Sequence, residues 1–281
     1  MSEKKVPAAV DLSINSDLAR QILAGFIRSE LARVGLSKAV LGLSGGVDSA
    51  LACVLAVEAL GAKNVVAVRM PYRTSSQESL EHAQLVADKA GIDLLTVPIT
   101  EMADGLISRF PGMDQTRRGN IMARCRMIVL YDLSAEQHGL VIGTGNKTEI
   151  LLGYTTLFGD SACALNPLGD LYKTQVRQLS RDLSVPEVIV AKPPTADLFA
   201  GQTDEADLGY TYASVDQLLY LLVDERYSIS DCVSAGYEPG FVERVVERIR
   251  RNQFKRMLPP IAKLSNRTVG YDFLYLRDWG T

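Results

Sequence analysis

The sequence predicts a doubly wound α/β fold, in which a parallel sheet is covered by helices on both faces. Short apolar runs alternate with segments of helical periodicity four times within residues 16–143. Each run is apolar at successive positions, as strands buried on both faces require. Crossover helices between parallel strands account for the alternation. A chain of 281 residues that is 47% hydrophobic and 22% charged is ordinary for a globular protein of this kind.

The individual elements follow from the same patterns. The first helix is expected at 16–34, with Ser16 as its N-cap and Gly35 as its stop. Apolar runs predict strands at 38–43, 64–69, 93–97 and 139–143. Helical spacing predicts further helices at 50–60, 76–90, 100–109, 118–137, 173–184 and 238–256.

The second half of the chain is less regular. Residues 191–210 are rich in Pro, Asp and Gly and are predicted to form a long loop, a candidate lid from 196 onward. A C-terminal helical region and tail runs from about 238 to 281, and its aromatic end is expected to pack against the body or a partner subunit. Because no low-complexity linker divides the chain, a single domain over 1–281 is predicted.

Composition and charge argue against several functional classes. The net charge of −3 gives no sign of a nucleic-acid binder, and no apolar run is long enough to span a membrane. The four cysteines form no C-x-x-C pair, which favours reduced thiols and a cytoplasmic location. Cys53 and Cys125 are expected in the core, and His82 and His138 on the surface. With only two histidines, the chain offers few candidates for His-dependent catalysis.

A Gly-rich turn lies between the first predicted strand and the helix that follows. Residues 44–49 read SGGVDS, and in α/β sheets this position binds anions on backbone N–H groups. Asp48 fits such a site if Mg²⁺ bridges it to a phosphate. A plain turn in which Asp48 or Ser49 caps the helix is the alternative. The turn contains no lysine, which argues against a Walker-type NTPase.

The hexapeptide resembles the pyrophosphate-binding loop of the N-type ATP pyrophosphatases, which cleave ATP between its α and β phosphates. Downstream segments narrow the resemblance: GTGNKTEILLGY at 143–154, TLFGD at 156–160, NPLGDLYK at 166–173, PTADL at 194–198 and QTDE at 202–205. In this order they resemble the ammonia-dependent NAD synthetases over about residues 15–275. That resemblance implies an adenine nucleotide alpha hydrolase-like fold.

The resemblance also implies roles for particular residues. It places ATP on Gly42, Leu43, Ser44, Gly45, Gly46, Val47, Asp48, Ser49, Arg69, Thr144, Lys173 and Thr195. It makes Asp48 and Lys173 the catalytic residues, and Asp48 and Glu149 the Mg²⁺ ligands. It assigns Arg124, Asp160 and Lys255 to the deamido-NAD substrate. Phe254, Leu157, Ala164 and Ser75 depart from residues common in that family, mostly on the substrate side.

The reaction implied is the ATP-dependent amidation of deamido-NAD by ammonia through an acyl-adenylate, giving NAD, AMP and pyrophosphate. The implied enzyme is a C–N ligase that acts as a homodimer. The sequence leaves open whether nitrogen comes from free ammonia or from a separate, docked glutaminase. One alternative is another adenylating enzyme, such as a tRNA-modifying one, and a nucleotide-binding module without turnover is a second. From the residues alone, Glu149 could be a helix-terminal acid, Lys173 a surface lysine and Thr195 a turn hydroxyl.

Overall fold

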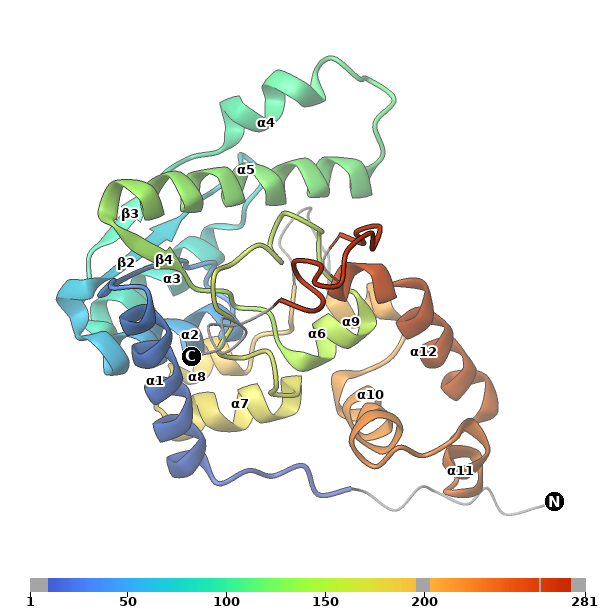
Figure 1. The fold of residues 1–281 in the computed structure, drawn as a ribbon. Helices are drawn as coiled ribbons and strands as arrows, with labels where there is room; N and C mark the ends of the chain where they lie inside the picture. The colour runs from blue at the N-terminus through green and yellow to red at the C-terminus, as the bar shows by residue number, and fades with distance from the viewer. Residues whose placement is uncertain (1–9, 196–202, 258, 274–281) are drawn as a thin grey trace.

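The computed structural model describes residues 10–195, 203–257 and 259–273 and has a parallel sheet at its centre (Figure 1). The strands are β1 (Lys38–Gly42), β2 (Val65–Arg69), β3 (Leu94–Thr96) and β4 (Gly139–Val141). Their order in the sheet is β3-β2-β1-β4. β1 pairs in parallel with both β2 and β4, and β2 pairs in parallel with β3. The predicted parallel sheet is confirmed.

Helices make up most of the rest of the described chain. In chain order they are α1 (Ser16–Arg33), α2 (Val47–Leu60), α3 (Gln77–Ala90), α4 (Thr100–Ile107), α5 (Gln115–Gln137), α6 (Lys147–Leu152), α7 (Lys173–Asp182), α8 (Glu187–Val190), α9 (Asp204–Leu208), α10 (Tyr212–Leu219), α11 (Ile229–Ser234) and α12 (Pro239–Arg251). Short 3₁₀ turns span Ala62–Asn64 and Gln253–Arg256, and a π-helical turn spans Tyr220–Asp224. Within the described ranges the helices are all too short or too polar to cross a lipid bilayer.

The central strand shows why helices cover both faces of the sheet. Successive side chains of a strand point to opposite faces. In β1, Ala39 and Leu41 join the apolar cluster formed with α1 and α2, whereas Val40 joins the cluster formed with α4 and α5. Figure 1 shows α4 and α5 above the sheet and α1, α2 and α7 below it. Ala39, Val40 and Leu41 are all fully buried, so the middle of the strand must be apolar on both faces.

The strand order fixes where a ligand can bind. From β1 the chain builds β2 and β3 to one side of the sheet and β4 to the other. In open parallel sheets, the crevice outside the carboxyl ends of the strands at such a reversal is the ligand site. The backbone leaving β1 and β4 remains tied there, since Leu43 N donates to Val68 O at 2.8 Å and Ile142 N donates to Val40 O at 2.9 Å. The Gly-rich turn therefore meets the residues that follow β4.

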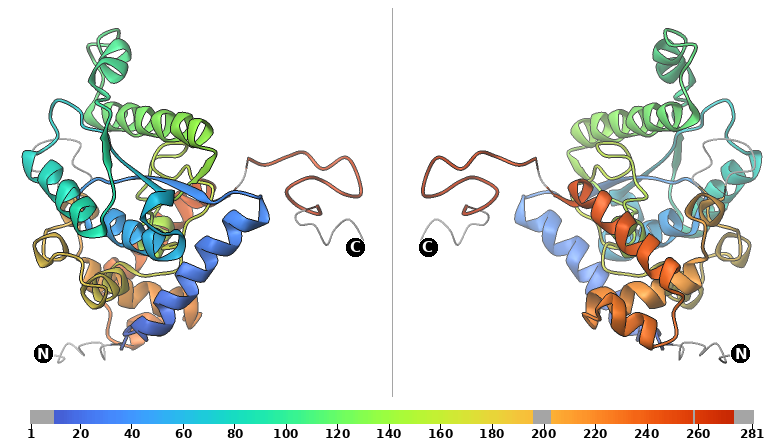
Figure 2. Two further views of the ribbon diagram at one scale, coloured as in Figure 1. Left: turned by 90° about the vertical axis from the view of Figure 1, so that its left-hand side faces the viewer. Right: turned by 90° about the vertical axis from the view of Figure 1, so that its right-hand side faces the viewer.

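The C-terminal region forms its own apolar cluster beside the sheet layers. Leu218 of α10 and Val242 and Val245 of α12 are fully buried in it. Residues 259–273 extend away from the body, as both views of Figure 2 show, and Leu264 is 96% exposed. The single domain predicted for 1–281 remains a prediction.

Several expected boundaries differ from the structure. Asn15, not Ser16, caps α1, because its side chain accepts a hydrogen bond from Leu18 N at 3.0 Å. α2 begins at Val47, so the second half of the Gly-rich turn is already the first helical turn. The long loop predicted at 191–210 contains α9, whose N-cap is Thr203. Residues 196–202 of the predicted lid lie outside the described residues.

Two burial predictions were wrong, and others are confirmed. β3 is an edge strand, and its Leu95 is 42% exposed instead of covered on both faces. His82 is buried, because α3 presses it against the Gly-rich turn, where its Cβ approaches Gly45. Cys53 and Cys125 are buried, and His138 is exposed, as expected.

Replacing Leu51 tests the α2 core. Leu51 is fully buried in the cluster below the sheet. Leu51→Ala leaves a cavity and is expected to lower the free energy of unfolding by about 2–5 kcal/mol. Leu264→Ala, at an exposed position, should change it by less than ~0.5 kcal/mol. Urea unfolding with an unchanged m-value measures both, and equal losses would contradict the placement of α2.

Candidate active site

The Gly-rich turn is held in shape by its own hydroxyl groups. Ser49 Oγ accepts a hydrogen bond from Ser44 N at 3.2 Å and donates one to Gly46 O at 3.0 Å. Gly46 N donates to Ser44 Oγ at 3.3 Å. At Gly45 the backbone has φ +81°, and a Cβ would lie 2.2 Å from the carbonyl oxygen of Ser79. A side chain is therefore excluded at Gly45 on two counts, conformation and space.

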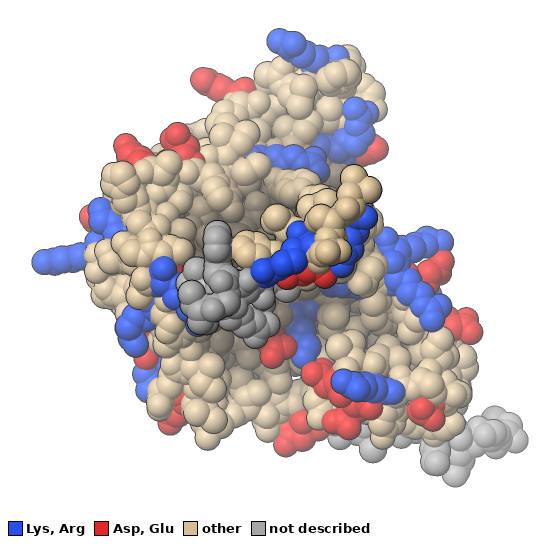
Figure 3. All heavy atoms as spheres, in the orientation of Figure 1, with Lys and Arg blue, Asp and Glu red and all other residues tan. Residues whose placement is uncertain are grey.

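A cleft of about 300 Å³ opens at the carboxyl ends of the strands. Of the predicted ATP-binding residues, the following line it: Gly42, Leu43, Ser44, Gly46, Val47, Asp48, Ser49, Arg69, Thr144, Lys173 and Thr195. Gly45 packs against α3 behind this wall. On the outer face shown in Figure 3, charges of both signs are interspersed, so the charges that distinguish the site are those inside the cleft.

Lys173 lies at the centre of these charges. Its Nζ is 2.5 Å from Asp48 Oδ2 and 3.1 Å from Glu149 Oε1, and its side chain is only 3% exposed. The ammonium also lies over the ring of Tyr212, 5.1 Å from its centroid. The two acids come from the N-terminal turns of α2 and α6, and Lys173 is the first residue of α7. Three helix starts thus converge on one buried ion cluster.

Burial and charge shift the pKa values of this cluster. Burial alone would lower the pKa of Lys173, but the Asp48 and Glu149 carboxylates outweigh it and hold that pKa above its ordinary value. Burial raises the pKa of Glu149 to about 7, opposed by the Lys173 ammonium and assisted by Asp48. Burial also raises the pKa of Asp204, which Tyr212 and Tyr154 hold by hydroxyl hydrogen bonds of 3.1 and 3.2 Å. The cluster therefore contains one cation facing three closely spaced acids.

Asn146 fixes the relative positions of the two acids. Its Nδ2 donates to Asp48 Oδ1 at 2.8 Å, and its Oδ1 accepts from Glu149 N at 3.0 Å as the N-cap of α6. Glu149 Oε2 accepts in return from Asn146 N at 3.3 Å, which completes a capping box. The sequence analysis missed this residue, although N-x-x-E at 146–149 is a recognisable capping signal.

Thr148 and Asp216 support the backbone of Lys173. Thr148 Oγ1 accepts from Lys173 N at 3.0 Å and donates to Asp216 Oδ1 at 2.6 Å. Asp216 Oδ2 accepts from Thr174 N at 2.8 Å, so a carboxylate from α10 caps the start of α7. Thr148 and Asp216 are completely buried. No short-range sequence pattern marks this contact, which joins residues 42 positions apart.

The three residues predicted to bind the second substrate differ in their positions relative to the cleft. Asp160 lines the cleft and accepts a hydrogen bond from Thr156 N at 2.6 Å, and burial raises its pKa. Arg124 donates from Nε and Nη2 to Leu157 O at 3.3 and 3.1 Å and is exposed. Lys255 Nζ donates to two loop carbonyls, of Gly153 and Thr155, at 2.7 Å each.

A second arginine of α5, Arg126, lines the cleft, and its Nε donates to Met70 O at 3.1 Å. Two positions apart on α5, the two arginines point in different directions. Neither Arg124 nor Lys255 is among the residues that line the cleft.

Comparisons with known proteins agree over nearly the whole chain. A family model described as NAD synthase matches residues 19–259. A curated relative from Trichlorobacter lovleyi, described as an NH(3)-dependent NAD(+) synthetase, is 56% identical over 269 residues, 96% of this chain and 98% of the relative.

Solved structures show the same similarity. An NH3-dependent NAD synthetase from Campylobacter jejuni, in complex with the nitrate ion, has a TM-score of 0.77 at 32% identity, covering 89% of this chain and 100% of its own. An NMN synthetase from Francisella tularensis has a TM-score of 0.78 at 30% identity, covering 90% of this chain and 100% of its own.

Replacing Lys173 tests the charge cluster. Lys173→Met leaves two mostly buried carboxylates without their cation and should cost about 3–5 kcal/mol of unfolding free energy near neutral pH. A carboxyl whose pKa is raised by folding contributes stability at low pH that is lost as pH rises through its folded pKa. The loss should therefore be smaller at about pH 5 than at about pH 8. Urea unfolding at both pH values measures it, and an equal loss at the two would contradict the cluster.

The Thr148 hydroxyl can be tested with a matched pair of variants. Thr148→Val keeps the shape but removes the hydroxyl that donates to Asp216 Oδ1 and accepts from Lys173 N, which should cost about 1–3 kcal/mol. Thr148→Ser keeps the hydroxyl and should cost clearly less. Chemical unfolding distinguishes them. If Thr148→Val is as stable as the wild-type chain, the hydrogen bonds of this hydroxyl do not hold the start of α7.

Proposed function

The chain belongs to the NAD synthase family, and from that premise we propose that it is a ligase that converts deamido-NAD, ATP and ammonia to NAD, AMP and pyrophosphate. Its parallel sheet and flanking helices have the adenine nucleotide alpha hydrolase-like fold. The observation that carries the proposal is the convergence of the Gly-rich turn with Lys173, Asp48 and Glu149 in one cleft.

The reaction divides into two steps. In the first, the nicotinate carboxylate of deamido-NAD attacks the α-phosphorus of ATP, and the bond to the β-phosphate oxygen breaks to release pyrophosphate. In the second, ammonia attacks the carbonyl carbon of the acyl-adenylate, loses a proton and displaces AMP. Neither step needs a protein nucleophile, so positioning and charge stabilisation supply the catalysis.

Residues of the cleft are proposed to bind each part of ATP. Backbone N–H groups at the start of α2 and the ammonium of Lys173 are proposed to stabilise the departing pyrophosphate. Arg69 and Thr144 line the same cleft and are proposed to bind the nucleoside side of ATP, with Thr195 at the phosphates. Water has to be excluded from the cleft while the adenylate exists, because water would hydrolyse this intermediate.

Asp48 and Glu149 fit a magnesium ion that accompanies ATP. Both are oxygen donors on the cleft wall, and their carboxylates converge on one point, now occupied by the Lys173 ammonium. In the part of the chain that the structure describes, no group of three or more His, Cys, Asp or Glu side chains is arranged to hold a metal. We propose that the ion would take its other ligands from phosphates and water and would neutralise phosphate charge.

The second substrate and the assembly are also proposals. We propose that Asp160, Arg124 and Lys255 bind deamido-NAD, although the Lys255 ammonium already donates to two carbonyl groups.

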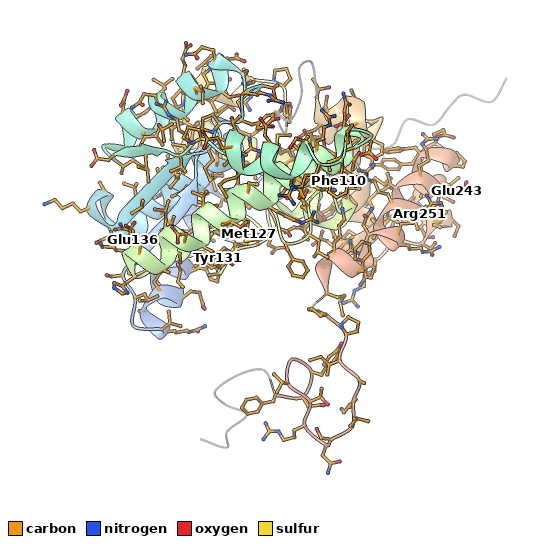
Figure 4. The ribbon with its side chains drawn as sticks, turned by 90° about the horizontal axis from the view of Figure 1, so that it is seen from above. Phe110, Met127, Tyr131, Glu136, Glu243 and Arg251 are labelled. Atoms are coloured by element: carbon orange, nitrogen blue, oxygen red, sulfur yellow. The ribbon has the colours of Figure 1, made fainter. Side chains whose placement is uncertain are left out.

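A homodimer is supported by exposed apolar residues on α5, including Tyr131 at 40% exposure and Ile128 at 52%. Figure 4 shows α5 lying across one face of the molecule. We place the enzyme in the cytoplasm, as its unpaired cysteines suggest.

Product analysis tests the proposal. The purified full chain with deamido-NAD, ATP, Mg²⁺ and ammonia should yield NAD and AMP in equal amounts. Asp48→Asn and Glu149→Gln should each lower kcat by about 10²-fold or more while circular dichroism stays unchanged. Glu136→Gln, on the exposed end of α5 (Figure 4), is the matched control and should keep full activity.

The outcomes of this assay are distinct. ADP as the nucleotide product, or no AMP above background, contradicts the proposal. Supplying glutamine in place of ammonia then identifies the nitrogen source. Turnover with glutamine only after another protein is added would point to a docked glutaminase.

A further inference from the structure

A second lysine reaches the cleft from the segment that follows α8. Lys192 lines the cleft, and its side chain is only 14% exposed. Its Nζ lies 3.0 Å from Glu78 Oε2 and donates to Ser79 Oγ at 3.2 Å. The hydrogen bond from Lys192 lowers the pKa of Glu78. The reaction steps proposed above assign no role to the Lys192 ammonium.

Ser79 connects Lys192 to the Gly-rich turn. The hydroxyl of Ser79 contacts Lys192 Nζ, and the carbonyl of the same residue packs directly on Gly45, where a Cβ would lie 2.2 Å away. Ser44, Gly46 and Lys192 all line one cleft. Ser79 therefore contacts both the Lys192 ammonium and the turn that is proposed to bind phosphates.

The two cleft lysines differ in how their charge is balanced. Lys173 already pairs with Asp48 and Glu149, and Asp204 adds a third negative charge nearby. Lys192 pairs with Glu78, whose side chain is 58% exposed. An ion pair with an exposed carboxylate stabilises little, because water solvates the partner well. Lys192 can exchange Glu78 for a phosphate oxygen at small cost, whereas Lys173 has to share its charge between the phosphates and two mostly buried acids.

We propose that Lys192 is a further phosphate-binding residue of the ATP site, which Glu78 and Ser79 hold at the cleft until a polyphosphate replaces Glu78. Glu78 then competes with the phosphate for the same ammonium and weakens ATP binding. This inference rests on the proposed function, since it takes ATP and pyrophosphate as the ligands of the cleft.

Four single variants and one double variant of the full chain test the proposal by calorimetric titration with Mg-ATP and with inorganic pyrophosphate. Lys192→Met should weaken both ligands about tenfold or more, and Lys192→Arg should retain most of the affinity. Glu78→Gln should tighten binding about two- to fivefold, because the competitor is lost. Lys63→Met removes the same charge from an exposed turn after α2 and should change nothing.

The sign of the Glu78 effect distinguishes ligand binding from a structural brace. If the Lys192–Glu78 pair only holds α3 in place, Glu78→Gln and Lys192→Met should weaken binding together. In the double variant the gain from Glu78→Gln should disappear, since no lysine remains to be released. If Lys192→Met does not fold, Lys192→Gln replaces it, and thermal unfolding checks each variant.

Only one pattern supports the proposal: weaker binding without Lys192, tighter binding without Glu78, and loss of that gain in the double variant. Any other pattern overturns it. Because the titrations need no turnover, they give a result even if the wild-type chain forms no NAD. Wild-type product analysis separately decides the proposed function.

Discussion

The buried ammonium of Lys173 is the interaction on which the candidate site depends. Carboxylates removed from water are costly unless a cation and hydrogen-bond donors compensate them. Lys173 supplies the cation for Asp48 and Glu149, and the Asn146 amide supplies a donor to Asp48. The same contacts tie α2, α6 and α7 together, so the electrostatics of the site and the packing of its helices are one arrangement.

The arrangement suits the chemistry proposed for it. A polyphosphate brings negative charge to a cleft in which one cation is already shared among acids. Additional positive charge then has to come from elsewhere, from a magnesium ion on the carboxylates or from other basic side chains on the wall. The Gly-rich turn contributes backbone N–H groups that carry no counter-charge of their own. The cleft can therefore contain acids although its proposed ligand is an anion, because a bound cation, basic side chains and backbone N–H groups supply the positive charge.

Much of the fold could be predicted because its patterns are local. Apolar runs separated by helical periodicity predicted the four strands of the sheet, and the resemblance of the motifs predicted Lys173, Asp48 and Glu149 as one site. Predictions failed where burial depends on distant neighbours. His82 lies on a helix with many polar residues, yet the Gly-rich turn covers it. Leu95 belongs to an apolar run, yet the edge position of β3 exposes it.

By itself, the sequence determined the parallel α/β class, the Gly-rich turn at the end of the first strand and the residue types of an ATP-cleaving site. These depend on short periodicities and on motifs whose members lie close together in the chain. The tertiary structure alone decided which arginine of α5 faces the cleft, how Asp216 caps a helix 42 residues away, and that Lys192 lies beside the Gly-rich turn. The physical reason is that a side chain pairs with the charges and hydrogen-bonding groups nearest to it in space. The packing of strands and helices in the folded chain decides which groups those are.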